Sequence, residues 1–364
     1  MKVGIITVWD DENYGNRLQH YAVQETIKKA TYGGEAVTIE YSDDYKSRFS
    51  QSAERFIRRL KAATTYRFCA QGKLKIERVK RAKNLRAFSE KHLRLDGGLI
   101  SNGHIPHGLN EKYDFFVVGS DQVWNPHFNH ATPELFLTFA ETEKRIAYAP
   151  SFGVAVLPDN EEGYFVKMLS GIPHLSCREE AGSALITKLT GREALTLIDP
   201  TMMLTADEWL QVTNTQLPKN NYLLTYFLGR PSDEAYSFIA SAAAQKGLEI
   251  VSLNDVDNME LYGIGIEDFL GYFHNVGIVV INSFHGTVFS MLFRKPFVVF
   301  GREPMNSRIE TLLHKFGQDT RKYPQIFSSD FYAIDYSCMD KLLEKERNVA
   351  ISYLREAMGL KDGR

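Results

Sequence analysis

The sequence predicts an α/β protein with two Rossmann-like domains that face a cleft. Short apolar runs rich in β-branched residues alternate with segments of helical spacing, a pattern typical of parallel sheets covered on both faces. The length of 364 residues exceeds what one hydrophobic core usually serves, so two domains are expected. Polar motifs directly follow the apolar runs, where open α/β sheets bind ligands. The strand candidates are residues 2–9, 35–41, 114–119, 145–149, 195–198, 222–228, 249–253, 278–281 and 296–300.

The first domain is expected over residues 1–165. It opens with a strand, a polar turn, a helix over 18–30 and a second strand, which is the start of a Rossmann-like unit. A basic segment over 46–94 then interrupts the order, and its apolar spacing predicts two or three amphipathic helices. The buried strand over 114–119 resumes the sheet.

The second domain is expected over residues 166–334. It repeats the alternation of strands and helices, and no low-complexity linker marks its start. Residues 335–364 are predicted to form a final helix that packs back across both halves. The expected helices of the second domain cover 233–246, 288–293 and 308–316.

Composition excludes several classes of protein. The three cysteines, Cys69, Cys177 and Cys338, match no metal or disulfide spacing, so a reducing cytoplasm is expected. We see no secretory signal and no apolar run near the roughly 20 residues of a membrane-spanning helix. The histidine pairs His104/His107 and His127/His130 lack neighbouring carboxylates, which disfavours a metal site.

Charge is distributed unevenly along the chain. Residues 46–94 hold 16 Lys and Arg against 3 Asp and Glu, a local net charge of +13, while the remainder carries −15. This basic segment therefore requires a partner or a neutralising surface.

The segment Ser283-Phe-His-Gly-Thr places a histidine where the strand over 278–281 passes into a helix. The N–H groups of a helix N-terminus bind anions, and the next strand edge brings two arginines to the same region. The alternative is a structural histidine. The candidate residues of this anion pocket are Ser283, His285, Gly286, Thr287, Arg302, Ser307 and Arg308.

A second motif follows the strand over 114–119 and contains Ser120, Asp121, Gln122 and Trp124. Asp121 is a candidate to take a proton from an attacking sugar hydroxyl, and Trp124 to stack on a sugar ring. The alternative is that Asp121 caps the next helix and Trp124 lies in the core. Both interpretations stay open.

The turn after the first strand contains Asn13, Gly15 and Asn16. Glycine permits close approach of the backbone and the amides recognise hydroxyls, although an ordinary turn with Asn16 as helix cap explains the residues equally well. The turn is not a G-x-G-x-x-G, which disfavours a nicotinamide dinucleotide.

Two further candidate site residues lie in other loops. Arg178 is suited to a bidentate pair with a phosphate or carboxylate, although a surface salt bridge is the simpler explanation. Ser151 follows the strand over 145–149 and is a candidate for binding substrate.

Taken in series, these motifs resemble the polysaccharide pyruvyl transferase family over about residues 3–320. The closing Lys295-Pro-Phe and Asn306-Ser-Arg-Ile-Glu segments are also similar, whereas residues 46–94 and the C-terminal tail are not covered. The segments that carry the resemblance are Asn13-Tyr-Gly-Asn-Arg-Leu-Gln, Asp114-Phe-Phe-Val-Val-Gly-Ser-Asp-Gln-Val-Trp-Asn-Pro, Ala147-Tyr-Ala-Pro-Ser-Phe-Gly, Ser176-Cys-Arg-Glu-Glu, Ile198-Asp-Pro-Thr and Ser283-Phe-His-Gly-Thr.

The resemblance implies a two-domain GT-B-like fold. It also implies transfer of pyruvate from phosphoenolpyruvate to two hydroxyls of a sugar, which forms a ketal and releases phosphate. By motif, His285 would be the catalytic acid and Arg178 would hold the donor. The family usually shows a small hydroxyl residue shortly after the arginine–acid pair, where this chain has Ala181 and Gly182, with Ser183 displaced.

The implied chemistry fits the candidate residues. His285 as imidazolium can protonate the methylene carbon of phosphoenolpyruvate, and Asp121 is the candidate base for the sugar hydroxyl. Arg178, with Arg302 or Arg308, would stabilise the departing phosphate. No metal or other cofactor is required, because fixed cations can neutralise the donor.

The expected acceptor is a saccharide on a polyprenyl diphosphate. The basic segment would then dock on the anionic inner face of the membrane, although a solvated face or an oligomer contact fits nearly as well. No nucleic-acid partner is expected. The rival functions are a nucleotide-sugar glycosyltransferase of the same fold and a non-catalytic glycan- or anion-binding protein.

Overall fold

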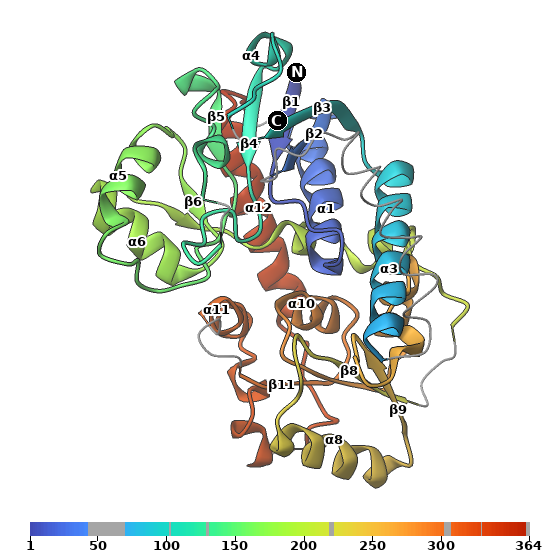
Figure 1. The fold of residues 1–364 in the computed structure, drawn as a ribbon. Coiled ribbons are helices and arrows are strands. Elements are labelled where there is room, and N and C mark those ends of the chain that lie inside the picture. Colours follow the sequence, from blue (N-terminus) through green and yellow to red (C-terminus); the bar gives the residue numbers. More distant parts are fainter. Residues whose placement is uncertain are drawn as a thin grey trace.

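The computed structural model describes residues 1–42, 70–101, 103–128, 131–217, 222–301, 307–328 and 330–361. Two parallel sheets lie one above the other, each covered by helices (Figure 1). The upper sheet has the strand order β3-β2-β1-β4-β5. Its strands are β1 (Lys2–Ile6), β2 (Glu35–Ser42), β3 (Leu95–Ser101), β4 (Phe115–Val118) and β5 (Arg145–Ala147).

The lower sheet has the order β11-β10-β8-β9, and all its strand pairs are parallel. The two sheets confirm the expected α/β architecture with two Rossmann-like units. The lower strands are β8 (Tyr222–Tyr226), β9 (Glu249–Leu253), β10 (Ile278–Ile281) and β11 (Phe297–Val299).

The β-branched runs form the central strands because both faces of each sheet are covered. All four residues of β10 are buried, and so are the last three residues of β4. Burial on both faces removes the alternation that a half-exposed strand would need.

Helices connect successive strands and cover the sheets. The upper half contains α1 (Tyr14–Ala30), α3 (Ala70–His92) and α4 (Leu109–Lys112). The remaining helices of the described chain are α5 (Glu162–Ser170), α6 (Glu180–Thr190), α7 (Ala206–Leu210), α8 (Asp233–Lys246), α9 (Ile266–Asn275), α10 (Phe284–Leu292), α11 (Ser307–Lys315) and α12 (Met339–Ala357).

A small third sheet pairs β6 (Ser176–Cys177) with β7 (Leu195–Thr196). His174 forms a parallel bridge with Ile146 of β5, so this small sheet lies beside the upper one. The neighbourhood of the upper sheet therefore extends beyond residue 165, the boundary expected between the domains.

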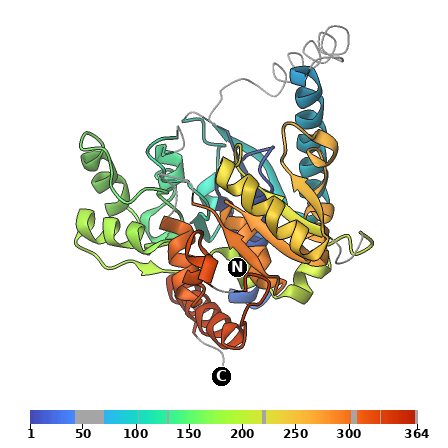
Figure 2. The same cartoon turned by 90° about the horizontal axis from the view of Figure 1, so that it is seen from below.

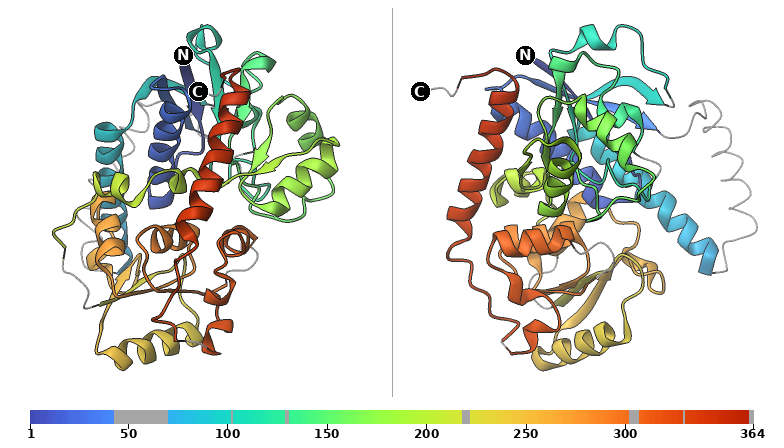
Figure 3. Two further views of the ribbon diagram at one scale, coloured as in Figure 1. Left: turned by 180° about the vertical axis from the view of Figure 1, so that it is seen from behind. Right: turned by 90° about the vertical axis from the view of Figure 1, so that its left-hand side faces the viewer.

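Helix α3 is the described part of the basic segment, and residues 46–69 lie outside the described residues. One end of α3 stands away from the body of the protein (Figures 2 and 3). The helix also reaches the lower half: Arg81 Nε donates to the carbonyl of Tyr262 at 2.7 Å, and Asn84 Nδ2 donates to the carbonyl of Gly263 at 2.8 Å.

Helix α12 runs from the lower half back along the upper half (Figure 3, left). Its Tyr353 hydroxyl donates to the carbonyl of Ala147 in β5 at 2.8 Å, and Arg355 Nε donates to the carbonyl of Ala30 at 3.2 Å. Helix α12 thus contributes to the packing of the upper sheet and its helix α1.

The two halves meet through a shared core. Tyr14 of α1 stacks on Phe269 of α9, with ring centroids 4.5 Å apart. The Tyr14 hydroxyl donates to the carbonyls of Tyr262 and Ile264. Buried aromatic contact and hydrogen bonding therefore fix the start of α1 against the lower half.

Candidate functional site

A cavity of about 640 Å³ lies between the two sheets. Residues 8–13 follow β1 and Asp121 follows β4, while residues 282–285 follow β10. In the upper sheet β1 and β4 are the neighbours at which the strand order reverses, and β8 and β10 hold this position in the lower sheet. The cavity therefore occupies the switch points of both sheets, where open α/β sheets bind ligands.

The N-terminus of α10 faces this cavity. Ser283 caps the helix by accepting a hydrogen bond from the N–H of Gly286 at 3.3 Å, and no acidic residue occupies the first turn. Thr287 is fully buried and donates to the carbonyl of Ser283. Ser283 and Gly286 therefore shape the turn that presents His285, while Thr287 braces it from within.

The N-terminus of α1 meets α10 across the cavity. Asn13 caps α1, again without an acid in the first turn. A Cβ atom added at Gly15 would overlap Nδ1 of His285, so the imidazole of one half rests directly on the backbone of the other. Gly15 thus permits close approach of the two halves, as the sequence suggested.

His285 belongs to a buried network of charges. Its Nε2 lies 3.8 Å from Oδ2 of Asp199 and has no hydrogen-bond partner within the described chain. Oδ2 of Asp199 also accepts a hydrogen bond from Nη1 of Arg178 at 2.5 Å. Thr201 donates to the other carboxylate oxygen through its N–H and hydroxyl.

Asp121 is the second carboxylate of the network. Its backbone lies in the left-handed region, with φ of 69°, which turns the chain sharply after β4. Asn16 Nδ2 donates to its Oδ2 at 3.1 Å, and Nη2 of Arg178 lies 3.7 Å from its Oδ1. The N–H of Gln122 donates to Oδ1 at 2.9 Å.

The electrostatics of the network follow from burial and proximity. Burial opposes the charge of Asp199, but Arg178 and His285 outweigh it and lower the pKa of Asp199 to about 2. Burial likewise opposes the charge of Asp121, yet Arg178 and His285 lower its pKa. Burial lowers the pKa of His285, although Asp199 and Asp121 act in the opposite direction. Burial and the two carboxylates therefore act in opposite directions on the charge of the imidazole, and burial has the larger effect.

Arg178 lies one layer beneath the cavity. Its guanidinium packs on the Phe284 ring, with Cζ 4.5 Å from the centroid, and its side chain is 1% exposed. Neither Nε nor Nη2 has a hydrogen-bond partner among the described residues. Arg178 thus supplies positive charge from below and is not a surface salt bridge.

The cavity wall of the lower half is completed by α11. Arg308 lines the cavity and is 9% exposed, with Cζ 5.9 Å from the Phe284 ring. Ser307 is the first residue of α11. Arg302, expected in the same pocket, lies outside the described residues.

Several expected site residues have structural contacts instead. Ser120 donates to the carbonyl of Ala149 at 2.7 Å and lies 3.3 Å from Asp199, so it supports the network from within. Ser151 is fully buried and donates to Glu179. Gln122 lines the cavity and accepts a hydrogen bond from Asn125.

The expectation that Trp124 stacks on a sugar is wrong. Trp124 is fully buried, stacks on Phe136 at 5.3 Å and donates to the carbonyl of Leu135. The aromatic residues that do line the cavity include Trp9, Phe128 and Phe284. Trp124 was misplaced because an indole after a strand has the same sequence pattern whether it faces the core or a cleft.

Two residues of the site carried no role in the sequence analysis. Asp199 stood within the Ile198-Asp-Pro-Thr motif, and an aspartate before a proline at a strand end is the signal that marks it. Asp10 lines the cavity directly after β1. Its place in an acidic turn made it indistinguishable from a solvated loop residue.

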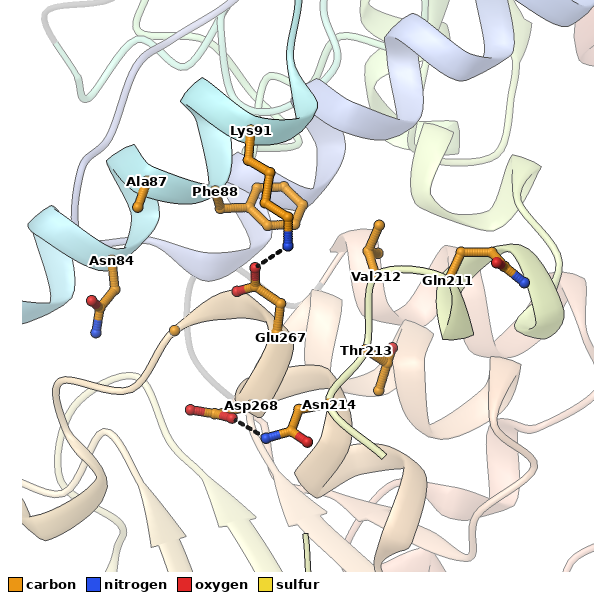
Figure 4. A pocket seen from close by; sticks show the side chains of 11 residues that line it. Asn84, Ala87, Phe88, Lys91, Gln211, Val212, Thr213, Asn214, Glu267 and Asp268 are labelled. Carbon is orange, nitrogen blue, oxygen red and sulfur yellow. Dashed lines mark hydrogen bonds and ion pairs between the residues drawn. The ribbon is translucent and has the colours of Figure 1, made fainter. Parts of the chain in front are cut away.

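A second cavity, of about 540 Å³, lies between α3, α9 and residues 211–214 (Figure 4). Lys91 pairs with Glu267 at 3.7 Å, and Asn214 Nδ2 donates to Asp268 at 2.7 Å. The charged groups of this cavity therefore already have partners, and the Lys91–Glu267 pair joins α3 to α9.

Comparisons with known proteins fit this geometry. A family model described as polysaccharide pyruvyl transferase matches residues 13–304. No curated protein matches the chain. The UDP-GlcNAc 2-epimerase of Methanocaldococcus jannaschii is similar with a TM-score of 0.50 and 12% identity, over 96% of this chain and 93% of that one.

A putative UDP-N-acetylglucosamine 2-epimerase from Listeria monocytogenes gives a TM-score of 0.47 and 9% identity, over 98% of this chain and 90% of that one. At such low identity these likenesses concern the fold alone. The Methanocaldococcus jannaschii structure agrees with the two-domain GT-B-type architecture built from the two sheets.

Proposed function

Because the chain belongs to the polysaccharide pyruvyl transferase family, we propose that it transfers pyruvate from phosphoenolpyruvate to two hydroxyls of a sugar. The products are a pyruvate ketal and phosphate. The observation that carries the proposal is the placement of His285 at a helix N-terminus, between two arginines and at the switch point of both sheets.

The part of the cavity where the N-termini of α1 and α10 meet suits a small polyanion. Two helix N-termini without acidic first turns, those of α1 and α10, direct N–H groups and positive dipole ends toward the cavity. Arg308 lines the same cavity and Arg178 lies beneath it. The phosphate and carboxylate of phosphoenolpyruvate match this set of donors.

His285 is the proposed acid. The negative charges of the donor raise the pKa of the imidazole when they bind, so His285 takes up a proton and delivers it to the methylene carbon. Arg178 and Arg308 stabilise the charge that develops on the departing phosphate. The protein's own cations neutralise the donor, so the proposal needs no metal.

The upper wall suits a saccharide. Trp9 and Phe128 present aromatic surface to the cavity, and Asn13 and Gln122 lie beside them. Aromatic faces with amides are the usual partners of sugar rings and hydroxyls. A saccharide bound here would bring its hydroxyls toward His285.

We further propose that the acceptor is linked to a polyprenyl diphosphate and that α3 docks on an anionic membrane surface. Within the described chain, none of the helices has the length and hydrophobicity that a membrane crossing requires. Sedimentation with anionic vesicles at low and high salt tests the docking, and no binding at low salt overturns it. The residues of α3 that would make the contact are Lys73, Ile76, Arg78, Val79, Lys80 and Lys83, all exposed.

The decisive test is phosphate release from phosphoenolpyruvate with a panel of lipid-linked saccharides. We expect His285→Ala to reduce the rate by about 100-fold or more, because it removes the acid that protonates the enol. Circular dichroism should show an unchanged fold. A His285→Ala variant with the wild-type rate contradicts the proposed role.

A thermal-shift comparison separates the proposal from its rivals. Phosphoenolpyruvate should stabilise the protein more than UDP or GDP does at equal concentration, because the ligand with the lower Kd stabilises the native state more. A preference for a nucleoside diphosphate indicates a nucleotide-sugar glycosyltransferase. Binding of phosphoenolpyruvate without phosphate release indicates a non-catalytic anion-binding protein.

A further inference from the structure

Four carboxylates stand at the upper wall of the cavity, and three of them are already committed. Asp121 accepts hydrogen bonds from Asn16 and from the N–H of Gln122, and it lies beside Arg178. Asp11 accepts from Trp9 Nε1 at 2.9 Å and from Arg17 at 3.2 Å. A carboxylate held in this way is a poor acceptor for a further proton.

Glu12, the third committed carboxylate, points to α3. Its Oε2 lies 3.3 Å from Nε of Arg78, and its backbone carbonyl accepts a hydrogen bond from Arg81. Glu12 therefore joins the first loop to the basic segment and is turned away from the reacting groups.

Asp10 is the exception. Its Oδ1 accepts one hydrogen bond, from the N–H of Glu12 at 2.8 Å, while Oδ2 has no partner in the described part of the chain. The backbone of Asp10 is held at both ends: its N–H donates to Oδ1 of Asn16, and its carbonyl accepts from Nη2 of Arg17. Asp10 thus lines the cavity as an exposed residue, with its backbone fixed and one carboxylate oxygen free of protein partners in the described chain.

The surroundings of Asp10 favour a base. Desolvation raises its pKa, and the charge of Asp121 acts in the same direction. Asp121 has the opposite shift, because Arg178 and His285 outweigh its burial and lower its pKa. A general base becomes more effective as its pKa approaches the working pH. The raised pKa of Asp10 therefore makes it the better base, and the lowered pKa of Asp121 makes that residue the poorer one.

The geometry points to Asp10, and not Asp121, as the general base that deprotonates the attacking sugar hydroxyl. The inference rests on the proposed function. As His285 protonates the methylene carbon of phosphoenolpyruvate, the hydroxyl oxygen bonds to the neighbouring C2 and its proton passes to Oδ2 of Asp10.

Addition of the second sugar hydroxyl completes the reaction. A second hydroxyl oxygen bonds to C2 while the C2–O bond to phosphate breaks and phosphate leaves with the electron pair. The proton of this hydroxyl returns to the neutral His285, and the proton on Asp10 passes to solvent. Asp121 serves as a positioning residue that holds Arg178 and Asn16 and keeps the site anionic beside the imidazole.

The test compares Asp10→Asn with the matched control Asp159→Asn, which changes an exposed aspartate that does not line the cavity. Phosphate release from phosphoenolpyruvate is measured from pH 4 to pH 9 with methyl hexosides and lipid-linked saccharides as acceptors. We expect Asp10→Asn to lower kcat by about 100-fold or more and to abolish the acidic limb of the pH–rate profile. The thermal shift produced by phosphoenolpyruvate should stay unchanged, and Asp159→Asn should retain both rate and profile.

The outcomes separate this inference from the proposed function. Asp10→Asn with the wild-type rate and an unchanged acidic limb assigns the base elsewhere, while the proposed function stands. A wild-type protein that releases no phosphate overturns both. If Asp10→Asn fails to fold, Asp10→Ala with added formate replaces it: a rate restored by formate supports the role, and a folded variant that formate leaves inactive contradicts it.

Discussion

The two cavities of this protein are similar in size and differ in how their charges are matched. In the cavity at the switch points, buried nitrogens of His285 and Arg178 have no hydrogen-bond partners among the described residues. In the cavity beside α3, Lys91 and Glu267 form an exposed pair and Asp268 is bonded to Asn214 (Figure 4). A cavity indicates a site when its polar groups await a ligand, because unsatisfied buried groups cost free energy that binding can offset.

The largest effect is expected when one charged partner is removed from the buried network at the first cavity. Replacing Asp199 with Ala leaves the guanidinium of Arg178 buried without its closest carboxylate. We expect a loss of about 3–5 kcal/mol in the free energy of unfolding, measured by urea denaturation. A loss below about 1 kcal/mol would show that the network contributes little to stability.

The same variant has a defined pH dependence. Because the pKa of Asp199 falls from 3.8 to about 2 on folding, its contribution is fully present above pH 3.8 and disappears as the pH falls through about 2. The wild type should therefore lose its advantage over Asp199→Ala between these values.

A smaller effect is expected where the two halves touch. Gly15→Ala places a methyl group against Nδ1 of His285 and displaces the imidazole. A displacement of this size costs on the order of 100-fold in rate. The matched control is Gly163→Ala, since a Cβ atom there meets no neighbouring atom within 4 Å. Equal rates for the two variants would contradict the contact.

The smallest effect is expected in the cavity beside α3. Lys91→Ala removes one partner of an exposed pair with Glu267, so the free energy of unfolding should change by less than about 1 kcal/mol. Phosphate release should stay at the wild-type rate. A large loss of activity would give this second cavity a role in the reaction and weaken the comparison.

The strand ends could be predicted from the sequence because buried parallel strands have a distinctive composition. His285 and Arg308 were predicted near one another, since they follow neighbouring strands of one parallel sheet, whereas Asp121 follows a strand of the other sheet. Gly15 was predicted as a point of close approach, although its partner was not. These predictions needed only strand periodicity and the geometry of parallel sheets.

Other features depended on contacts that periodicity does not encode. Trp124 was assigned to the site but lies in the core, whereas Trp9 lines the cavity. Asp199 lies beneath the site because the small sheet of β6 and β7 folds beside β5. Asp10 differs from Asp11 and Glu12 only in which neighbours its carboxylate meets.

The course of α12 has a consequence for the order in which the protein is made. The upper half begins with the first strand of the chain, yet it is sealed by Tyr353 and Arg355 near the chain's end. Residue 355 must therefore have left the ribosome before the upper half can bury the surface that α12 covers. Until then its hydrophobic residues remain open to chaperones, although domains generally fold as units during synthesis.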